Sequence, residues 1–200
     1  MPRLFMPLSI LLHCFKGEKT GIYFVDSTKL SVCHNKRIFR NKTFKNLAVK
    51  GKSTMGWFFG FKLHLIINNK GQFIAMEITK ANVDDRAGLN GILKGLKGFL
   101  FGDKGYISEK LFKELYRKGL KLVTGIRSNM KNYFMIFWEK MMLKKRNCIE
   151  TTFGNLKENM FLEHHRHRSP VNFLVHICSC LISYFFTVPK KQIKSAVIQY

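Results

Sequence analysis

The chain has 200 residues, of which 46% are hydrophobic, and its 35 Lys and Arg against 12 Asp and Glu give a formal net charge of +23. The apolar content is enough for one buried core and excludes a largely disordered chain. Such an excess of positive charge indicates a polyanionic partner, and nucleic acid is a better candidate than an anionic membrane surface.

The first half of the chain predicts a short leader followed by three strands. Residues 1–20 are interpreted as the leader, because the apolar run at 4–15 is followed by charged residues and by no small-residue cleavage site. A basic, polar stretch separates the first two strands, and no acidic residue occurs from 27 to 76. Strands are expected at 21–26, 57–67 and 72–79, with a hairpin turn at 68–71.

The second half predicts helices that alternate with two further strands. Helices are expected from 82 or 84 to 96, from 109 to 118 behind a Ser108 cap, and over most of 134–161. Strands at 99–103 and 120–124 complete an α/β fold, a mixed five-stranded sheet flanked by helices. The apolar run 171–188 approaches membrane-spanning length, but polar residues interrupt it, so a buried core helix is favoured.

Three acids in this basic chain are candidate metal ligands. Asp26 and Asp103 each follow an expected strand, and Glu150 shares one stripe of an expected helix with Arg146 and Lys157. Phosphodiester chemistry with two divalent cations needs several carboxylates that converge on one point. Two simpler interpretations stay open: each Asp is a turn or helix cap, and Glu150 forms an ordinary helix ion pair with Arg146.

Two clusters of basic residues are candidate contacts to DNA. The basic stretch after the first strand, with Lys36, Arg37, Arg40 and Lys42, is expected to bind the phosphate backbone. Phosphate contact is also favoured over a metal site for a second basic cluster, namely His164, His165, Arg166, His167 and Arg168.

Two tryptophans and two further acids favour structural roles. Trp57 and Trp138 have the rings to stack on bases, but tryptophans within apolar runs are more often part of the core. Asp84 and Asp85 are most simply helix caps. Five scattered cysteines indicate neither zinc nor a disulfide framework.

Several sequence blocks, in order and at compatible spacing, resemble bacterial insertion-sequence transposases of the DDE class. The resemblance runs from 21 to 189. The blocks are VDSTKLSVCH, TMGWFFGFKLHLIIN, ITKANVDDR, FGDKGYIS, TGIRSNMK, KKRNCIETTFGNLKE and LEHHRHRSPVNF.

The resemblance implies an RNase H-like fold and metal-dependent DNA cleavage and strand transfer in the transposition of an insertion element. It implies that Asp26, Asp103 and Glu150 are the catalytic metal ligands for Mg²⁺ or Mn²⁺, with two ions expected. Arg146 and Lys157 match the R-x3-E-x6-K signature, whose basic residues contact DNA near the cut. Leu143 stands where the longer signature has Tyr.

The same resemblance implies an organisation and a setting. Residues 1–20 correspond to the remnant of a missing N-terminal region, 21–189 to the catalytic domain, and 190–200 to a basic C-terminal tail. The expected partners are element-end and target DNA, with a homo-oligomer assembled on DNA, in the bacterial cytoplasm at the nucleoid and not at a membrane. Two alternatives stay open: an inactive DNA-binding remnant, and an RNase H-like nuclease that cuts without joining.

Overall fold

A mixed β-sheet forms the centre of the structure, a computed structural model that describes residues 2–89, 91–126, 130, 135–163 and 167–187. In this part of the chain the sheet has six strands in the order β2-β3-β1-β5-β6, and β4 also pairs with β3. The strands are β1 (Ile22–Cys33), β2 (Val49–Ser53), β3 (Gly56–Asn68), β4 (Phe73–Lys80), β5 (Gly98–Gly102) and β6 (Leu120–Thr124). The predicted mixed α/β sheet is confirmed, and β2 is added to the five expected strands.

The sheet is antiparallel on one side of β1 and parallel on the other. β3 runs antiparallel to β1, β2 and β4, whereas β1, β5 and β6 are parallel to one another. The β3–β4 hairpin forms at the predicted turn, where the Asn68 side-chain oxygen accepts hydrogen bonds from the backbone N–H groups of Lys70 and Gln72. Gly71 completes this turn with a positive φ of 73°.

The first strand is longer than the sequence predicts. It continues past Asp26 to Cys33, so Asp26 lies within the strand, opposite Leu65 of β3, rather than at the strand end. The extension forms because Leu30 and Val32 alternate with polar residues and are buried on the helix-covered face of the sheet.

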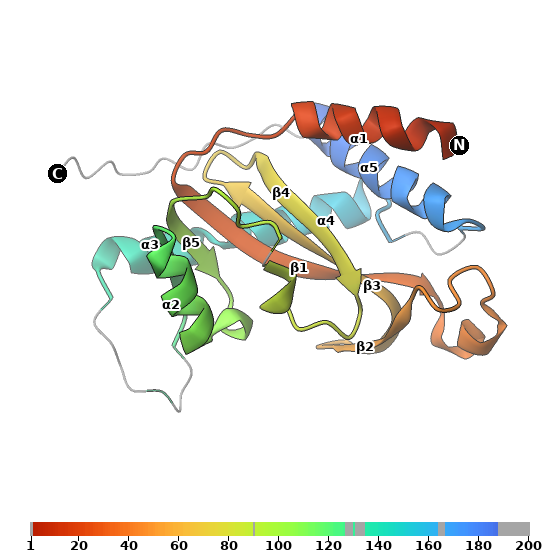
Figure 1. Ribbon diagram of the computed structural model, residues 1–200, viewed down its shortest axis with the longest axis horizontal. Coiled ribbons are helices and arrows are strands. Elements are labelled where there is room, and N and C mark those ends of the chain that lie inside the picture. The colour runs from red at the N-terminus through yellow and green to blue at the C-terminus, as the bar shows by residue number, and fades with distance from the viewer. Residues whose placement is uncertain (1, 90, 127–129, 131–134, 164–166, 188–200) are drawn as a thin grey trace.

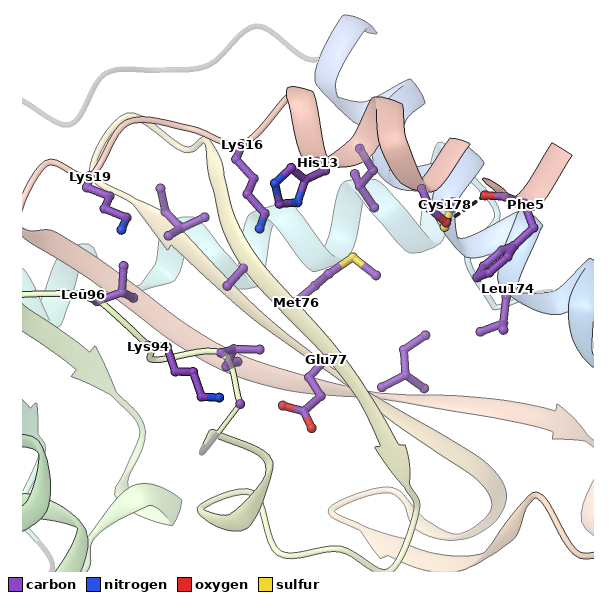
Figure 2. A pocket seen from close by; sticks show the side chains of 17 residues that line it. Phe5, His13, Lys16, Lys19, Met76, Glu77, Lys94, Leu96, Leu174 and Cys178 are labelled. Atoms are coloured by element: carbon purple, nitrogen blue, oxygen red, sulfur yellow. Dashed lines mark hydrogen bonds between the residues drawn. The ribbon is translucent and has the colours of Figure 1, made fainter. Parts of the chain in front are cut away.

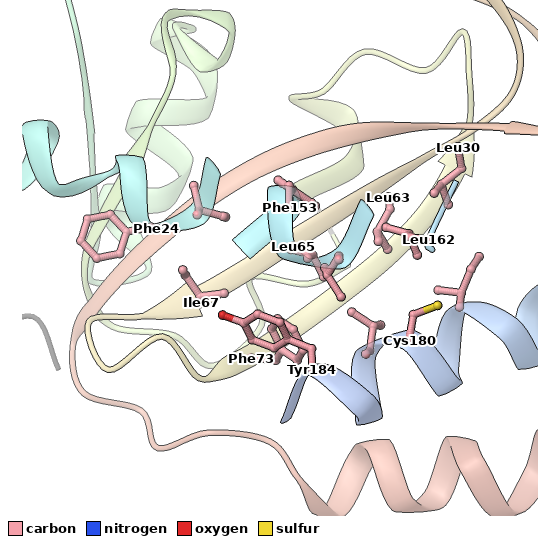
Figure 3. Packing of buried hydrophobic residues seen from close by; sticks show 14 of the residues in the cluster. Phe24, Leu30, Leu63, Leu65, Ile67, Phe73, Phe153, Leu162, Cys180 and Tyr184 are labelled. Carbon is pink, nitrogen blue, oxygen red and sulfur yellow. The ribbon is translucent and has the colours of Figure 1, made fainter. Parts of the chain in front are cut away.

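Helices α3 (Phe137–Lys145), α4 (Asn147–Glu158) and α5 (Pro170–Thr187) pack on one face of the sheet, and α1 (Phe5–Cys14) lies along α5 (Figure 1). The core on this face is built from alternate residues of the strands, such as Leu63, Leu65 and Ile67, packed against Phe153 and Tyr184 (Figure 3). The opposite face is covered by α2 (Glu109–Arg117) and by the segment 87–96.

The predicted helix from 82 or 84 to 96 is wrong. The described residues of this segment, which are all but residue 90, form turns and a 3-10 turn at Ala87–Leu89. The reason is its glycines: Gly95 has a positive φ of 70°, and Gly88 lies directly against the buried ring of His64. A Cβ at position 88 would come within 2.5 Å of His64 Nε2, so the backbone approaches the sheet more closely than a side-chain-bearing helix can.

The other expected helices form near their predicted places. Ser108 caps α2 by accepting a hydrogen bond from the Leu111 N–H, as the sequence predicts. The helical pattern before residue 161 is divided into α3 and α4 at Arg146. The apolar C-terminal run forms α5, whose Ile177 and Leu181 are fully buried in the core.

Two further expectations concern the membrane and the end of the chain. Among the described residues, every helix is too short or too polar to cross a membrane. The expected basic tail at 190–200 lies outside the described residues.

Candidate active site

Asp26 and Asp103 are brought side by side by the parallel pairing of β1 and β5. Phe24 of β1 is in register with Phe101 of β5. Asp26 comes two residues after Phe24, and Asp103 comes two residues after Phe101. Asp103 stands just beyond β5, at the start of the 3-10 turn Lys104–Tyr106. Because neighbouring strands are about 4.8 Å apart, this register places the two carboxylates on adjacent backbones.

Arg146 connects Asp26 to the third predicted acid. Its guanidinium Nη1 lies 3.4 Å from Asp26 Oδ2, and its Nη2 lies 2.6 Å from Glu150 Oε1. Arg146 is the residue between α3 and α4, and α4 packs against β1, so the first turn of α4 faces Asp26. The helix ion pair between Arg146 and Glu150 is therefore present, and the same guanidinium also reaches the sheet.

The pKa of Asp26 reflects this crowding of acids. Burial is the main cause that raises the pKa of Asp26 to about 6, and the negative charges of Asp103 and Glu150 raise it further. The Ser27 backbone N–H, which donates to Asp26 Oδ1 over 2.8 Å, and the positive charge of Arg146 both lower it. Asp26 is thus a poorly solvated carboxyl group whose ionised form needs more positive charge than Arg146 provides.

These carboxylates suit a hard divalent cation, but they do not form a closed ligand cluster. Oxygen ligands are what Mg²⁺ and Mn²⁺ prefer. In the described ranges no group of three or more His, Cys, Asp or Glu side chains is close enough to hold a metal ion. The bridging guanidinium of Arg146 lies between Asp26 and Glu150, which are the two acids that an ion would have to share.

The remaining predicted contact residues are distributed over two regions. Lys36, Arg37 and Arg40 are exposed on the 3-10 segment Asn35–Arg40, and Lys42 is exposed just after it. Lys157 forms an ion pair with Glu163 at 3.0 Å. The His167 ring lies 5.0 Å from that of His176, centroid to centroid. His164, His165 and Arg166 lie outside the described residues.

Asp85 has a role near the site that the sequence does not predict. Its expected role as a helix cap is wrong, because that helix does not form. Instead, Ser27 Oγ donates to Asp85 Oδ1 over 3.0 Å, and Lys62 Nζ donates to the same oxygen over 3.1 Å. These contacts attach the segment after β4 to β1, directly beside Asp26. No local sequence signal marks the contact, because Ser27 and Asp85 are separated by 58 residues.

The two tryptophans have different environments. Trp138 packs edge-on against Phe99, with 5.0 Å between ring centroids, so the expectation of a structural role is confirmed there. The same expectation is wrong for Trp57, of which 63% is exposed. The reason is its place at the start of β3, directly after the β2–β3 turn, where it pairs with Lys52 of β2, a strand at the edge of the sheet.

A separate cavity of about 610 Å³ lies between α1, β4 and the segment 91–96, apart from the three carboxylates. Figure 2 shows Glu77 and Lys94 at one side of it and His13 and Lys16 at the other. Its walls are mostly apolar, with Met76 and Leu96 among them.

Comparison with known structures gives the fold. The chain is similar to the piggyBac transposase in its synaptic complex with hairpin DNA, with 11% identity and a TM-score of 0.57. The match covers 91% of this chain and 50% of that one, so the chain spans about half the length of that transposase. This similarity confirms the expected RNase H-like arrangement of the sheet and helices.

Two further structures match at lower TM-scores. One is a chain of the simian T-cell lymphotropic virus intasome in complex with a PP2A regulatory subunit, with 12% identity, a TM-score of 0.48, and coverage of 86% and 51%. The other is the catalytic core domain of BIV integrase, with 12% identity, a TM-score of 0.45, and coverage of 84% and 86%.

Comparison with known sequences gives the family. None of the curated proteins compared matches the chain. The family described as "Transposase DDE domain" matches residues 16–170, which is well over half of the chain and includes Asp26, Asp103 and Glu150. The chain therefore belongs to the transposase DDE domain family.

Proposed function

We propose that this chain is the catalytic domain of a transposase that cleaves DNA and joins the resulting 3′-OH to target DNA. Two observations support the proposal: Arg146 pairs with both Asp26 of β1 and Glu150 of α4, and the register of β1 and β5 sets Asp103 beside Asp26. The raised pKa of Asp26 supports it, because both other acids contribute to that shift.

The three carboxylates would hold divalent cations, Mg²⁺ or Mn²⁺, and two ions are expected. Such ions, when bound, activate an attacking oxygen and stabilise a leaving oxygen in phosphodiester chemistry. Asp26 contributes a rigid position, because it is paired with Leu65 of β3 and lies two residues beyond the point where β1 also pairs with β5. Glu150 is half exposed on the first turn of α4 and shares the Arg146 guanidinium with Asp26.

Arg146 has two roles in this proposal. Without bound cations it neutralises part of the charge on Asp26 and Glu150. When cations take that place, the guanidinium is released to bind a phosphate of the DNA beside the cut. Lys157 lies about two turns beyond Glu150 on α4 and would bind a further phosphate on the same side, in competition with Glu163.

The basic residues outside the site would hold the DNA backbone. Lys36, Arg37, Arg40 and Lys42 are exposed together, and no acid occurs between 27 and 76 to compete with phosphate. His164–Arg168 would bind phosphate as well. Binding that depends on these cations falls steeply as salt concentration rises. The partners would be element-end and target DNA, with a homo-oligomer on DNA, in a bacterial cytoplasm.

The test is nicking of supercoiled plasmid DNA in Mn²⁺ by the wild type and by Asp103→Asn. The proposal expects the wild type to produce nicked or linear plasmid and the variant to lose this activity by at least about 100-fold. The matched control is Asp84→Asn, because Asp84 is an exposed aspartate paired with Arg86. Equal cleavage by the wild type and Asp103→Asn would remove Asp103 from the site.

Two alternatives are separated in the same assay. A nuclease that cuts without joining would nick plasmid, but it would not transfer a labelled 3′-OH oligonucleotide to the plasmid. A DNA-binding domain without activity would retain plasmid in a mobility-shift gel and leave it uncut in Mn²⁺. The effect of the negative charges of Asp103 and Glu150 on the pKa of Asp26 supports an active site over this second alternative.

A further inference from the structure

Large apolar side chains are exposed around β2, both at the β2–β3 turn and in the segment that precedes β2. Phe39 is 94% exposed, Met55 82% and Trp57 63%. Figure 1 shows the segment between β1 and β2 extending past the end of the sheet, away from α2 and α3. Exposed apolar side chains that lie together in one patch mark interaction sites, whereas single ones carry no such meaning, so the contacts among these residues matter.

Specific contacts join these rings to lysines in one surface. Lys52 of β2 is the cross-strand partner of Trp57 in β3, and Lys50, two residues away, points to the same face. The Lys50 ammonium lies 5.6 Å from the centroid of the Phe39 ring. We call these four residues, Phe39, Lys50, Lys52 and Trp57, the aromatic platform.

A hydrogen bond fixes the two halves of the platform relative to each other. The Asn35 side-chain amide donates to the Trp57 carbonyl over 2.7 Å, which connects the 3-10 segment Asn35–Arg40 to the start of β3. The platform is therefore held by β-sheet pairing on one side and by this contact on the other. A surface held in this way binds flat ligands at a low cost in side-chain entropy.

The platform lies on the same face of the sheet as the carboxylates. Alternate residues of a strand share one face, and from Trp57 the series continues through Phe59 and Leu63 to Leu65, which is opposite Asp26. Eight residues of strand separate Trp57 from Leu65, which corresponds to about 26 Å. Between the two places this face is covered by helices, with Leu63 and Leu65 fully buried, so the platform is a DNA contact separate from the carboxylates.

We propose that the aromatic platform binds the bases of single-stranded DNA by stacking on Trp57 and Phe39, while Lys50 and Lys52 bind the adjoining phosphates. This inference rests on the proposed function, because it takes DNA as the ligand. Phosphate contact alone gives no reason for exposed aromatic rings, whereas the faces of bases are accessible only where the duplex is open. The absence of acids from 27 to 76 favours a polyanion over a protein partner.

Trp57 is itself the reporter for the test, because the chain has two tryptophans and the other one, Trp138, packs in the core. In the Trp138→Phe variant, emission comes from Trp57 alone. Titration with an oligothymidine of about 15 nucleotides, in EDTA, is expected to quench this emission strongly. A blunt duplex of the same length is expected to quench it weakly. If Trp138→Phe does not fold, the difference between the wild type and Trp57→Phe gives the same signal.

Affinity measurements on variants test the stacking separately from charge. Trp57→Ala is expected to weaken binding of the single strand about tenfold and to change duplex binding less than about twofold, whereas Trp57→Phe retains most of the affinity. Lys52→Ala is the matched charge control. It should weaken the binding of both single strand and duplex, and reduce the salt dependence of the binding constant by about one released counterion. Equal losses for single strand and duplex with Trp57→Ala would overturn the proposal.

Two further outcomes are distinguishable. If Trp57 emission changes with protein concentration and not with oligonucleotide, the surface binds a second copy of the chain and the proposal is wrong. The Asp103→Asn variant should bind oligothymidine like the wild type, because the titration needs no metal. If the wild type quenches with oligothymidine but does not cleave plasmid, the aromatic platform is supported. Only the proposed cleavage activity is then contradicted.

Discussion

Arg146 forms ion pairs with two acids that are 124 positions apart in the sequence: Nη1 is 3.4 Å from Asp26 and Nη2 is 2.6 Å from Glu150. One carboxylate belongs to the sheet and the other to α4, so the guanidinium joins the two layers at the candidate site. Arg146 is itself largely buried, with 16% of its side chain exposed, which strengthens both interactions relative to surface ion pairs.

The first prediction is that Arg146 and divalent cations compete for the same carboxylates. Arg146→Ala should lower the melting temperature at pH 8 in EDTA, because Asp26 and Glu150 then repel each other without compensation. Mn²⁺ should stabilise this variant more than the wild type and at lower concentration. Thermal unfolding across a Mn²⁺ titration measures both effects.

Arg86→Ala is the control for this experiment, because it also breaks an Arg–Asp pair, but one that is exposed. Its response to Mn²⁺ should equal that of the wild type. A Mn²⁺ response of Arg146→Ala that is no larger than that of the wild type would mean that cations do not bind between Asp26 and Glu150.

The second prediction concerns the pH dependence of stability through Asp26. The pKa of Asp26 is raised from 3.8 to about 6, so the folded protein binds this proton more tightly than the unfolded chain. Well below pH 3.8 the group is protonated in both the folded and the unfolded state, so it does not lower the free energy of unfolding. The cost grows as pH rises and is complete above about pH 6, where it corresponds to about 3 kcal/mol.

Asp26→Asn imitates the neutral carboxyl group and should remove this cost. The variant is expected to be more stable than the wild type by up to about 3 kcal/mol at pH 8, with a difference that shrinks toward pH 4. Urea denaturation of both proteins at several pH values, without divalent cations, gives the comparison. A difference that is independent of pH would show that Asp26 titrates normally in the folded chain.

The third prediction tests the close approach of the segment 87–96 to the sheet. Gly88→Ala places a methyl group 2.5 Å from the buried His64 ring, which is held by a 2.8 Å contact between His64 Nε2 and Thr79 Oγ1. The ring cannot move without breaking that contact, so the free energy of unfolding should fall by about 1–3 kcal/mol.

Gly154→Ala is its matched control with the opposite sign. Gly154 lies within α4, and a Cβ there meets nothing within 4 Å. Alanine in the helix should therefore raise the free energy of unfolding by up to about 1 kcal/mol. Urea denaturation measures both variants, and equal effects of the two substitutions would contradict the packing of Gly88 against His64.

The fourth prediction concerns the buried Glu139 of α3. Its side chain is 4% exposed, and its carboxylate pairs with Lys121 of β6. Lys121→Met should destabilise the protein by about 2–4 kcal/mol at pH 8, because it leaves a buried carboxylate without its ammonium partner. Adding Glu139→Gln to that variant should restore part of the loss. A double-mutant cycle that shows strict additivity would exclude this coupling.

Much of the fold follows from local sequence patterns. The alternation in 57–67 and the Asn-rich turn at 68–71 predict the β3–β4 hairpin, and Ser108 with Gly119 predicts the limits of α2. These features are local, because strand alternation, turn geometry and helix caps depend on residues only a few positions apart. The sequence does not predict β2, because exposed lysines on either side of a buried Gly51 resemble a solvated loop.

The sequence by itself places Asp26 and Asp103 after apolar strands and Glu150 on a helix stripe, and the resemblance of whole sequence blocks to DDE transposases then singles these acids out as candidate ligands. The tertiary structure decided their surroundings: the parallel register of β1 and β5 sets Asp26 beside Asp103, and the packing of α4 on β1 brings Arg146 to Asp26. It also decided that Trp57 is exposed and that Gly88 touches His64. Contacts between residues far apart in the chain depend on how complete elements pack, and no short stretch of sequence contains that information.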